Sequence, residues 1–289
     1  MTKEALYYEM EGVACRCLLC PRRCLISDGE AGFCRVRAAD GGKLYAASYG
    51  AAAGLAIDPI EKKPLYQFRP GSVILSYGSY GCNMRCPWCQ NNSISQNPPP
   101  TSAPRLEPTA LLRQAVSTAD SQNNIGIAFT YNEPLTSPEF IMDTAPLLRA
   151  AGLATVIVTN ATVCEAPFKD ILPHADAMNI DLKGFTDGFY NNCGASLETV
   201  KRNIAAAAQH PGCHIEVTTL IVPGENDSEE TMEAEAAWLA GIDECIPLHI
   251  TRFFPRWKAT DKEPTPREPI EALAKTARRH LKSVYTGNI

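Results

Sequence analysis

Three cysteines, Cys82, Cys86 and Cys89, lie close together in the chain, and no further cysteine or histidine follows until Cys164. A [4Fe–4S] cluster has four iron corners, which protein thiolates normally fill. Three thiolates in so short a segment can hold three irons and leave the fourth iron open to a small molecule. A zinc knuckle or a set of buried thiols is the alternative, but a structural zinc ion normally takes four protein ligands. The spacing therefore favours a cluster that carries out chemistry over one that only stores electrons.

The composition is that of an ordinary globular protein, with 289 residues, a mass of 31.4 kDa, 45% hydrophobic residues and 20% charged residues. This length suits one large α/β domain with an appendage, or two domains. The formal net charge of −5 gives no support for binding to nucleic acids or membrane surfaces. No apolar run approaches the length that spans a bilayer.

The chain contains 12 cysteines, and its first residues lack the long apolar core of a secretion signal. In such a chain we expect metal ligation in a reducing compartment rather than disulfides. We therefore expect a cytoplasmic, oxygen-sensitive protein that works under anaerobic conditions, because an exposed iron is readily oxidised.

Residues 1–70 form a segment of distinct composition, which we interpret as a cysteine-rich N-terminal extension. Turn residues are frequent here, and we expect little regular structure before the Gly41-Gly42 turn, which leads into a strand over residues 43–49. Residues 58–64 read as a polar loop bounded by prolines. Pro70-Gly71 marks the boundary with the main domain, residues 71–289.

Strands and helices alternate in the main domain, which indicates parallel strands joined by crossover helices. The sequence predicts six strands, over residues 73–77, 125–130, 155–159, 177–181, 215–221 and 248–253. It predicts helices over residues 109–119, 137–151, 196–209 and 228–240. Six strands are fewer than the eight of a closed barrel and fit a partial (β/α)6 TIM-like barrel. An open, doubly wound sheet is the alternative that this pattern leaves.

Polar residues follow several of these strands. Ligands of parallel α/β folds bind at the carboxyl ends of strands, so we expect these side chains to share one rim with the cysteine loop. Caps of the following helices are the alternative interpretation for any single strand end. The candidates are Tyr131, Asn132, Glu133, Asn160, Asp181, Lys183 and His249.

The spacing C-x3-C-x2-C, with Trp88 before the last cysteine, resembles the signature of the radical S-adenosylmethionine (radical SAM) superfamily. The resemblance implies a partial barrel in which the open iron binds S-adenosylmethionine. An electron from the reduced cluster then cleaves this cofactor into methionine and a 5′-deoxyadenosyl radical, which abstracts hydrogen from a substrate. The strand-end acids and carbonyl groups suit the ammonium of S-adenosylmethionine, whereas Lys183 and His249 suit its carboxylate. Trp88 can pack beside the adenine.

The chain also resembles the glycyl-radical activating enzymes, among them pyruvate formate-lyase activating enzyme. Residues 131–134 lie where those enzymes carry a turn that contacts the cofactor's amino group. Asp181-Leu-Lys183 matches their Asp-Leu-Lys motif, and His249 matches a histidine near the same ligand. Their third strand ends in Asp-Thr-Asn-Gly, with the Asp helping to hold a monovalent cation. Here Val158 replaces that Asp, which puts such a cation site in doubt.

Strings along nearly the whole chain resemble the radical SAM enzyme of the AmmeMemoRadiSam system. They include residues 58–66, 177–184, 217–227, 249–255 and 284–288. This resemblance implies Memo-type and AMMECR-type partner proteins, and radical SAM chemistry implies an electron donor such as flavodoxin or ferredoxin. It implies no particular substrate. Glycyl-radical activation is the alternative reaction, and a non-catalytic iron–sulfur electron carrier or sensor is the alternative of another class.

Cys17, Cys20, Cys24 and Cys34 form a second set, C-x2-C-x3-C-x9-C, with Cys15 beside it. Four thiols in a segment too short for its own apolar core suggest a metal that stabilises the fold. A second, fully ligated iron–sulfur cluster would relay electrons, whereas zinc would only fold the segment; four free thiols are the third alternative. We interpret the remaining single cysteines as packed or incidental, although Cys193 follows the Asp-Leu-Lys strand and is a candidate to face the substrate.

Overall fold

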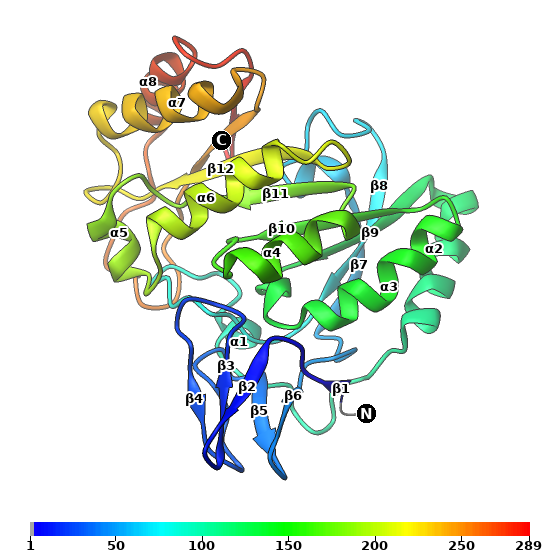
Figure 1. Cartoon of the computed structure of the whole chain (residues 1–289). Helices are drawn as coiled ribbons and strands as arrows, with labels where there is room; N and C mark the ends of the chain where they lie inside the picture. Colours follow the sequence, from blue (N-terminus) through cyan, green and yellow to red (C-terminus); the bar gives the residue numbers. More distant parts are fainter. Residues whose placement is uncertain (1–2) are drawn as a thin grey trace.

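The largest element is an eight-stranded sheet in which strands lie in the order β14-β13-β12-β11-β10-β9-β8-β7 (Figure 1). We describe it from a computed structural model that covers residues 3–289, apart from the side chain of Asp120. The strands are β7 (Gly54–Pro59), β8 (Val73–Gly78), β9 (Asn124–Thr130), β10 (Ala154–Thr159), β11 (Ala177–Asp181), β12 (His214–Ile221), β13 (Leu248–Arg252) and β14 (Val284–Gly287).

The strand order follows the chain without a reversal, so the sheet has no switch point of the doubly wound type. Strands β8 to β14 run parallel, whereas β7 pairs with β8 in the antiparallel direction. The sheet stays open between β7 and β14. This arrangement confirms the predicted partial barrel and adds a strand at each edge to the six that the sequence indicated.

Helices cover the outer face of the sheet, with α2 packed on β9, α3 on β10, and α8 on β13 and β14. Serine side chains begin two of them, because Ser196 and Ser228 accept hydrogen bonds from Thr199 and Thr231 N–H groups. None of the helices in residues 3–289 is both long and apolar enough to cross a membrane. The helices are α1 (Asn92–Ser95), α2 (Pro108–Gln122), α3 (Pro138–Ala150), α4 (Glu165–Ile171), α5 (Asp187–Asn192), α6 (Leu197–Ala208), α7 (Glu229–Asp243) and α8 (Arg267–Ala277).

The inner face of the sheet is filled by the chain that follows β7, where we had expected a polar loop. A 3-10 helix, η1 (Ile60–Lys62), carries Ile60 inward, and Leu65 follows it. Both side chains are fully buried against the strand residues Ile74, Ala128, Val156 and Ala177. The prediction of a polar loop was therefore wrong for this segment, because Ile60 and Leu65 form the inner core and the charged Lys63 is buried with Asp58 as its partner.

Residues 60–68 cross the open barrel from β7 to β12. The side chain of Asn179 donates a hydrogen bond to the Pro64 carbonyl (2.9 Å). The Glu216 carboxylate accepts from the N–H groups of Tyr66 (3.0 Å) and Gln67 (2.7 Å). These bonds give the buried backbone of an irregular segment its partners, so the segment is a fixed part of the barrel.

Two small three-stranded sheets form the N-terminal lobe, which lies at one end of the main sheet (Figure 1). One has the order β2-β3-β4 and the other β1-β6-β5. Gly41 and Gly42, both with positive φ, form the expected tight turn between β5 and β6. The strands are β1 (Lys3–Glu4), β2 (Tyr8–Glu11), β3 (Ala14–Cys17), β4 (Leu25–Ile26), β5 (Arg37–Asp40) and β6 (Lys43–Ala46).

The lobe differs from the sequence interpretation in two respects. Strands β2, β3 and β4 give regular structure to the cysteine-dense part, where we had expected little. Residues 54–59 pair with β8 and so belong by hydrogen bonding to the main sheet, although the sequence grouped them with the extension. Two- to four-residue strands of this kind leave almost no periodicity in a sequence.

A buried ion pair joins the lobe to the barrel. The Arg37 guanidinium on β5 donates to the Glu139 carboxylate on α3 at 2.9 Å, and both side chains are at most 1% exposed. Arg37 also donates to the Leu6 carbonyl, and Glu139 accepts from the Leu6 N–H (2.8 Å). Because each charge neutralises the other away from water, loss of one partner leaves an uncompensated buried charge.

We predict that Arg37→Met lowers the free energy of unfolding by about 3–5 kcal/mol, because Glu139 then lacks its counter-charge. Urea denaturation followed by circular dichroism measures this change. Lys43→Met is the matched control, since Lys43 pairs with Glu4 on the exposed surface of the same lobe, and it should leave the unfolding free energy unchanged. Equal effects of the two substitutions would contradict the assigned role of Arg37.

Candidate functional site

The cysteine loop joins the carboxyl end of β8 to α1, and its sulfur atoms have polar neighbours. The Cys82 sulfur accepts hydrogen bonds from the Met84 N–H (3.3 Å) and from the Asn160 side-chain amide (3.7 Å). The Cys89 sulfur lies 3.3 Å from the Ser95 hydroxyl oxygen. Cys86 is buried, and Cys82 and Cys89 are partly buried. Hydrogen bonds to sulfur are a means by which proteins stabilise thiolate ligands and tune iron–sulfur clusters.

Glu133, after β9, places a buried carboxylate beside this loop. One oxygen accepts from the Thr159 hydroxyl (2.6 Å) and the Leu135 N–H (3.0 Å), and the other from the Asn160 N–H (2.7 Å). Burial raises the pKa of Glu133 to about 7, against the effect of these hydrogen bonds. Its charge in turn helps to raise the pKa of Cys82, whose burial is the larger cause. A carboxylate has about four lone-pair positions, so one acceptor position stays open.

Asp181 and Lys183, at the end of β11, form an ion pair of 2.9 Å on the other side of the loop. Although burial opposes its charge, Asp181 and the Cys86 thiolate raise the pKa of Lys183 well above its usual value. A hydrogen bond from the Cys193 thiol and the nearby Lys183 lower the pKa of Cys86, while burial opposes them. The structure therefore gathers the strand-end groups Glu133, Asn160, Asp181 and Lys183 around the cysteine loop.

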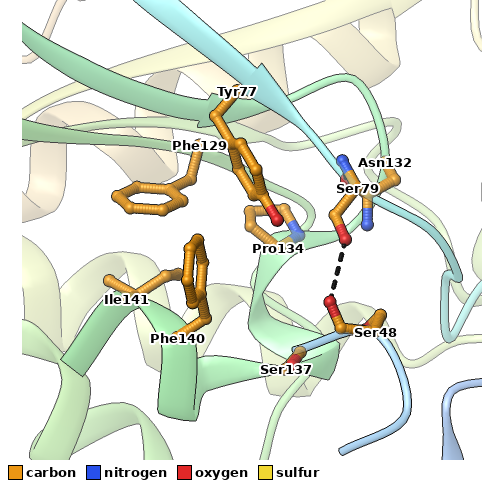
Figure 2. A pocket seen from close by; sticks show the side chains of 9 residues that line it. All are labelled: Ser48, Tyr77, Ser79, Phe129, Asn132, Pro134, Ser137, Phe140 and Ile141. Atoms are coloured by element: carbon orange, nitrogen blue, oxygen red, sulfur yellow. Dashed lines mark hydrogen bonds between the residues drawn. The ribbon is translucent and has the colours of Figure 1, made fainter. Parts of the chain in front are cut away.

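The Asn132 side chain is occupied within the protein. Its oxygen accepts from the Ser79 N–H (3.0 Å), and its amide donates to the carbonyls of Tyr80 (3.0 Å) and Gly81 (3.1 Å). Figure 2 shows Asn132 beside Ser79 at the edge of a pocket between the sheet and α3, which is lined mainly by aromatic and small polar residues. None of the three loop cysteines lines this pocket, so Asn132 here holds the loop in place.

Tyr131 reaches into the barrel interior. Its hydroxyl donates to Asp58 (2.7 Å), which also accepts from Lys63 (2.8 Å) and Ser76 (2.8 Å). Burial disfavours a charge on Asp58, yet these three hydrogen bonds hold its pKa well below the usual range. The sequence interpretation did not include Asp58 and Lys63 in the site, because they lie in a segment that reads as a surface loop.

Trp88 and His249 make contacts within the core. The Trp88 ring packs against Phe189 of α5 at 5.3 Å between ring centroids. His249 lies next to Glu216 (2.6 Å) and packs against the rings of both Tyr66 and Tyr285. Asp181 is level with Thr218, and Thr218 with His249, so His249 is two strands, about 10 Å, from Asp181. The structure does not bring His249 into contact with the cysteine loop.

Cys193 is the residue near the loop whose position was predicted least well from the sequence. Its side chain is fully buried beside Cys86, and its carbonyl accepts from the Arg85 N–H (2.9 Å). A single cysteine after a strand carries no signal that separates a contact with a cluster ligand from simple packing. Only the fold of the loop after α5 reveals the contact.

Comparison with known proteins agrees with this geometry. Residues 76–235, more than half of the chain, match the model of the radical SAM superfamily. An uncharacterized protein of Methanocaldococcus jannaschii, MJ0808, is 42% identical over 290 residues, which cover 99% of this chain and 85% of that protein. The chain belongs to the radical SAM superfamily.

A further relative and a solved structure also resemble this radical SAM chain. The pyruvate formate-lyase-activating enzyme of Clostridium pasteurianum is 25% identical over 208 residues, which cover 70% of this chain and 85% of that enzyme. The crystal structure of a radical SAM methyltransferase from Sphaerobacter thermophilus has a TM-score of 0.57 at 15% identity, covering 76% of this chain and 67% of that chain. The likeness to the methyltransferase shows the shared fold.

As a member of this superfamily, the protein is an enzyme that uses a [4Fe–4S] cluster and S-adenosylmethionine. The residues present fit both groups. Three thiols from one loop lie at the carboxyl end of the parallel sheet, with N–H donors directed at the Cys82 sulfur. A buried carboxylate, Glu133, and a cation, Lys183, flank the same loop and match the two charges of an amino-acid ligand.

We predict that stability falls as the pH rises from about 5 to 7, because Glu133 binds a proton more tightly in the folded chain than in the unfolded chain. Below the unfolded pKa of 4.5 both states are protonated and the full stability is present. Over the pH range in which Glu133 keeps its proton only in the folded chain, each pH unit lowers the free energy of unfolding by about 1.4 kcal/mol. Urea denaturation at several pH values should show this slope, and Glu133→Gln should flatten it. The exposed Glu165→Gln is the control, and an unchanged slope in Glu133→Gln would refute the assignment.

Proposed function

We propose that this radical SAM enzyme abstracts hydrogen from a substrate that a partner protein supplies or receives, with Cys82, Cys86 and Cys89 holding the catalytic cluster. When bound, the reduced cluster supplies one electron that cleaves S-adenosylmethionine into methionine and a 5′-deoxyadenosyl radical, which takes a hydrogen atom from the substrate. The observation that supports this assignment most directly is the buried Glu133 carboxylate beside Cys82. Its three internal hydrogen bonds fix this carboxylate in place and leave one acceptor position for a cation.

The side chains around the loop divide the recognition of S-adenosylmethionine between them. Glu133 accepts the ammonium through its remaining acceptor position, and Asn160 fixes Glu133 and the Cys82 sulfur at once. Lys183 donates to the carboxylate, since Asp181 occupies only one of its three N–H donors. The backbone and ring surfaces beside the loop are positioned by Tyr131, Asn132 and Trp88. His249 lies farther from the cysteine loop and contributes from there.

The likeness of residues 58–66 and 177–184 to the enzyme of the AmmeMemoRadiSam system supports Memo-type and AMMECR-type proteins as partners. In the structure, Asp58, Lys63 and Tyr66 from the first string lie inside the barrel, and Asp181 and Lys183 from the second flank the loop. Strings that distinguish this enzyme type therefore build the interior where a substrate would meet the cofactor. A flavodoxin or ferredoxin in the cytoplasm is the proposed source of the electron.

Glycyl-radical activation is the second candidate, because the chain is 25% identical to a pyruvate formate-lyase-activating enzyme. Val158 stands where the activating enzymes carry the Asp of their cation site, and this departure disfavours the second candidate. Deuterium transfer distinguishes the two. A deuterated metabolite that labels 5′-deoxyadenosine only with both partner proteins present supports the first candidate, whereas label from a glycine of a partner supports the second.

We predict that the anaerobically reconstituted enzyme releases 5′-deoxyadenosine on addition of S-adenosylmethionine and dithionite, and that Cys86→Ala abolishes the product. The exposed Cys245→Ala is the control and should retain full activity. Liquid chromatography with mass detection measures the product. An electron carrier or sensor would release none, and full activity in Cys86→Ala would exclude the three-thiol site as the source.

We further predict that Glu133→Gln weakens the binding of S-adenosylmethionine about 10- to 100-fold, the value of a lost charge-assisted hydrogen bond. Equilibrium dialysis with the loaded enzyme measures the dissociation constant. Glu235→Gln is a matched control, because Glu235 is equally buried but contacts Thr219 on the outer side of β12. Equal affinity in the Glu133 and Glu235 variants would remove Glu133 from the binding site.

A further inference from the structure

A second set of thiols surrounds a hollow in the N-terminal lobe. Cys17, Cys20, Cys24 and Cys34 all line one pocket, together with the apolar side chains of Leu19, Ile26 and Phe33. The four thiols come from β3, the turn that follows it and the loop before β5, and the pocket brings them together. The fifth cysteine of the lobe, Cys15, does not line the pocket.

Three arginines lie at or beside this pocket, and of these Arg37 has a carboxylate partner, Glu139. Arg37 lines the pocket, is 1% exposed, and its Nε atom has no hydrogen-bond acceptor. Arg22 and Arg85 donate only to backbone carbonyls and form no ion pair with any carboxylate in the described part of the chain. Their guanidinium groups lie on the two sides of the Phe33 ring, at 3.3 Å and 4.0 Å from its centroid.

Four thiolates on a metal centre would place negative charge beside the half-buried Arg22 and Arg85, which donate only to backbone carbonyls. The sulfides or thiolates of a cluster would also provide an acceptor for the Arg37 Nε–H, which has none within the protein. The unpaired donors around the pocket therefore favour an anionic occupant, and the four thiols that line it point to a metal centre.

The spread of the thiols distinguishes a cluster from zinc. A tetrahedral zinc ion with bonds of about 2.3 Å holds its sulfur ligands about 3.8 Å apart. Within residues 3–289, no three His, Cys, Asp or Glu side chains converge closely enough for one ion. The same is true of Cys82, Cys86 and Cys89, which belong to the cluster loop of this family. The N-terminal thiols line one hollow without converging on a single point, which suits a cubane of four irons and four sulfides.

The two thiol sets are adjacent. A Cβ atom at Gly81, next to Cys82, would lie only 2.7 Å from the Cys34 carbonyl oxygen and 2.6 Å from the Val36 side chain. The Arg85 guanidinium bridges the carbonyls of Cys82 (3.0 Å) and Phe33. Asn83 lines the N-terminal pocket and accepts from the Asn160 amide (3.0 Å), which also contacts the Cys82 sulfur.

We propose that Cys17, Cys20, Cys24 and Cys34 ligate a second [4Fe–4S] cluster, which passes single electrons to the cluster of Cys82, Cys86 and Cys89. A reduced protein donor of the flavodoxin or ferredoxin class loses one electron, the second cluster gains it and is reoxidised when the first cluster takes it, and no bond or proton changes in the transfer. The relay rests on the proposed function, whereas the metal site does not.

Metal analysis tests the site without reference to activity. The protein purified without oxygen should contain about eight irons and no zinc per chain, and Cys20→Ala/Cys24→Ala about four irons. Cys15→Ala is the matched control and should keep the full iron content. If the double variant fails to fold, Cys82→Ala/Cys86→Ala/Cys89→Ala decides, because the N-terminal site alone should hold about four irons and give the electron paramagnetic resonance signal of a reduced cluster.

One zinc per chain with four irons, or four irons with no second metal, would overturn the site. The relay has its own readout. Formation of 5′-deoxyadenosine by Cys20→Ala/Cys24→Ala should fall at least tenfold with reduced flavodoxin and stay near the original rate with dithionite, which is small enough to reach the first cluster directly. An unchanged rate, or an equal loss with both reductants, overturns the relay while leaving the iron count to decide the site. Absence of product in the unmodified enzyme would instead refute the proposed function.

Discussion

The position of the cysteine loop depends on hydrogen bonds that reach it from four distant parts of the chain. Asn132 holds the carbonyls of Tyr80 and Gly81 from the turn after β9. Cys193, after α5, accepts from the Arg85 N–H, and the Lys258 N–H donates to the Pro87 carbonyl. Arg22 of the N-terminal lobe donates to the Asn83 carbonyl. A loop without regular structure costs about 1–2 kcal/mol per residue to order, and these contacts offset that cost, so the lobe is a structural part of the site.

The hydrogen bonds that hold the loop also fix its position relative to the charged side chains around it. The loop passes between a buried carboxylate and a half-buried ammonium, because Glu133 influences Cys82 whereas Lys183 influences Cys86. Each group is held by partners that cannot move independently: Glu133 by the Thr159 hydroxyl and backbone N–H groups, Lys183 by Asp181. A zwitterionic ligand laid along the loop would meet opposite charges at its two ends without any rearrangement. This complementarity supports the assignment of the loop to an amino-acid cofactor better than the cysteine spacing alone.

Much of this architecture could be predicted from the sequence, and the failures have physical causes. The strands β8 to β13 are apolar runs buried on both faces, which leave a clear signal. The helices α4 and α8 were missed because Pro167 and Pro269 interrupt their patterns. Strand β7 lies at an edge, and most of its side chains are exposed, so it shows no run of buried residues.

The candidate site residues that directly follow strands lie together at the cysteine loop, because the carboxyl ends of parallel strands share one edge of the sheet. His249 is the second residue of β13 rather than a residue at its carboxyl end, so its side chain lies among Glu216, Tyr66 and Tyr285.

The segment after β7 fills the inner face of the open barrel. Ile60 and Leu65 form the inner core, and the Glu216 carboxylate of β12 holds the backbone of Tyr66 and Gln67. The interior is therefore packed with side chains along this segment. Lys63, bound to Asp58 and 4.7 Å from the Tyr131 ring centroid, lies between this plug and the turn that leads to Glu133. A buried charged pair therefore connects the inner core of the barrel to the turn that carries the residues beside the cysteine loop.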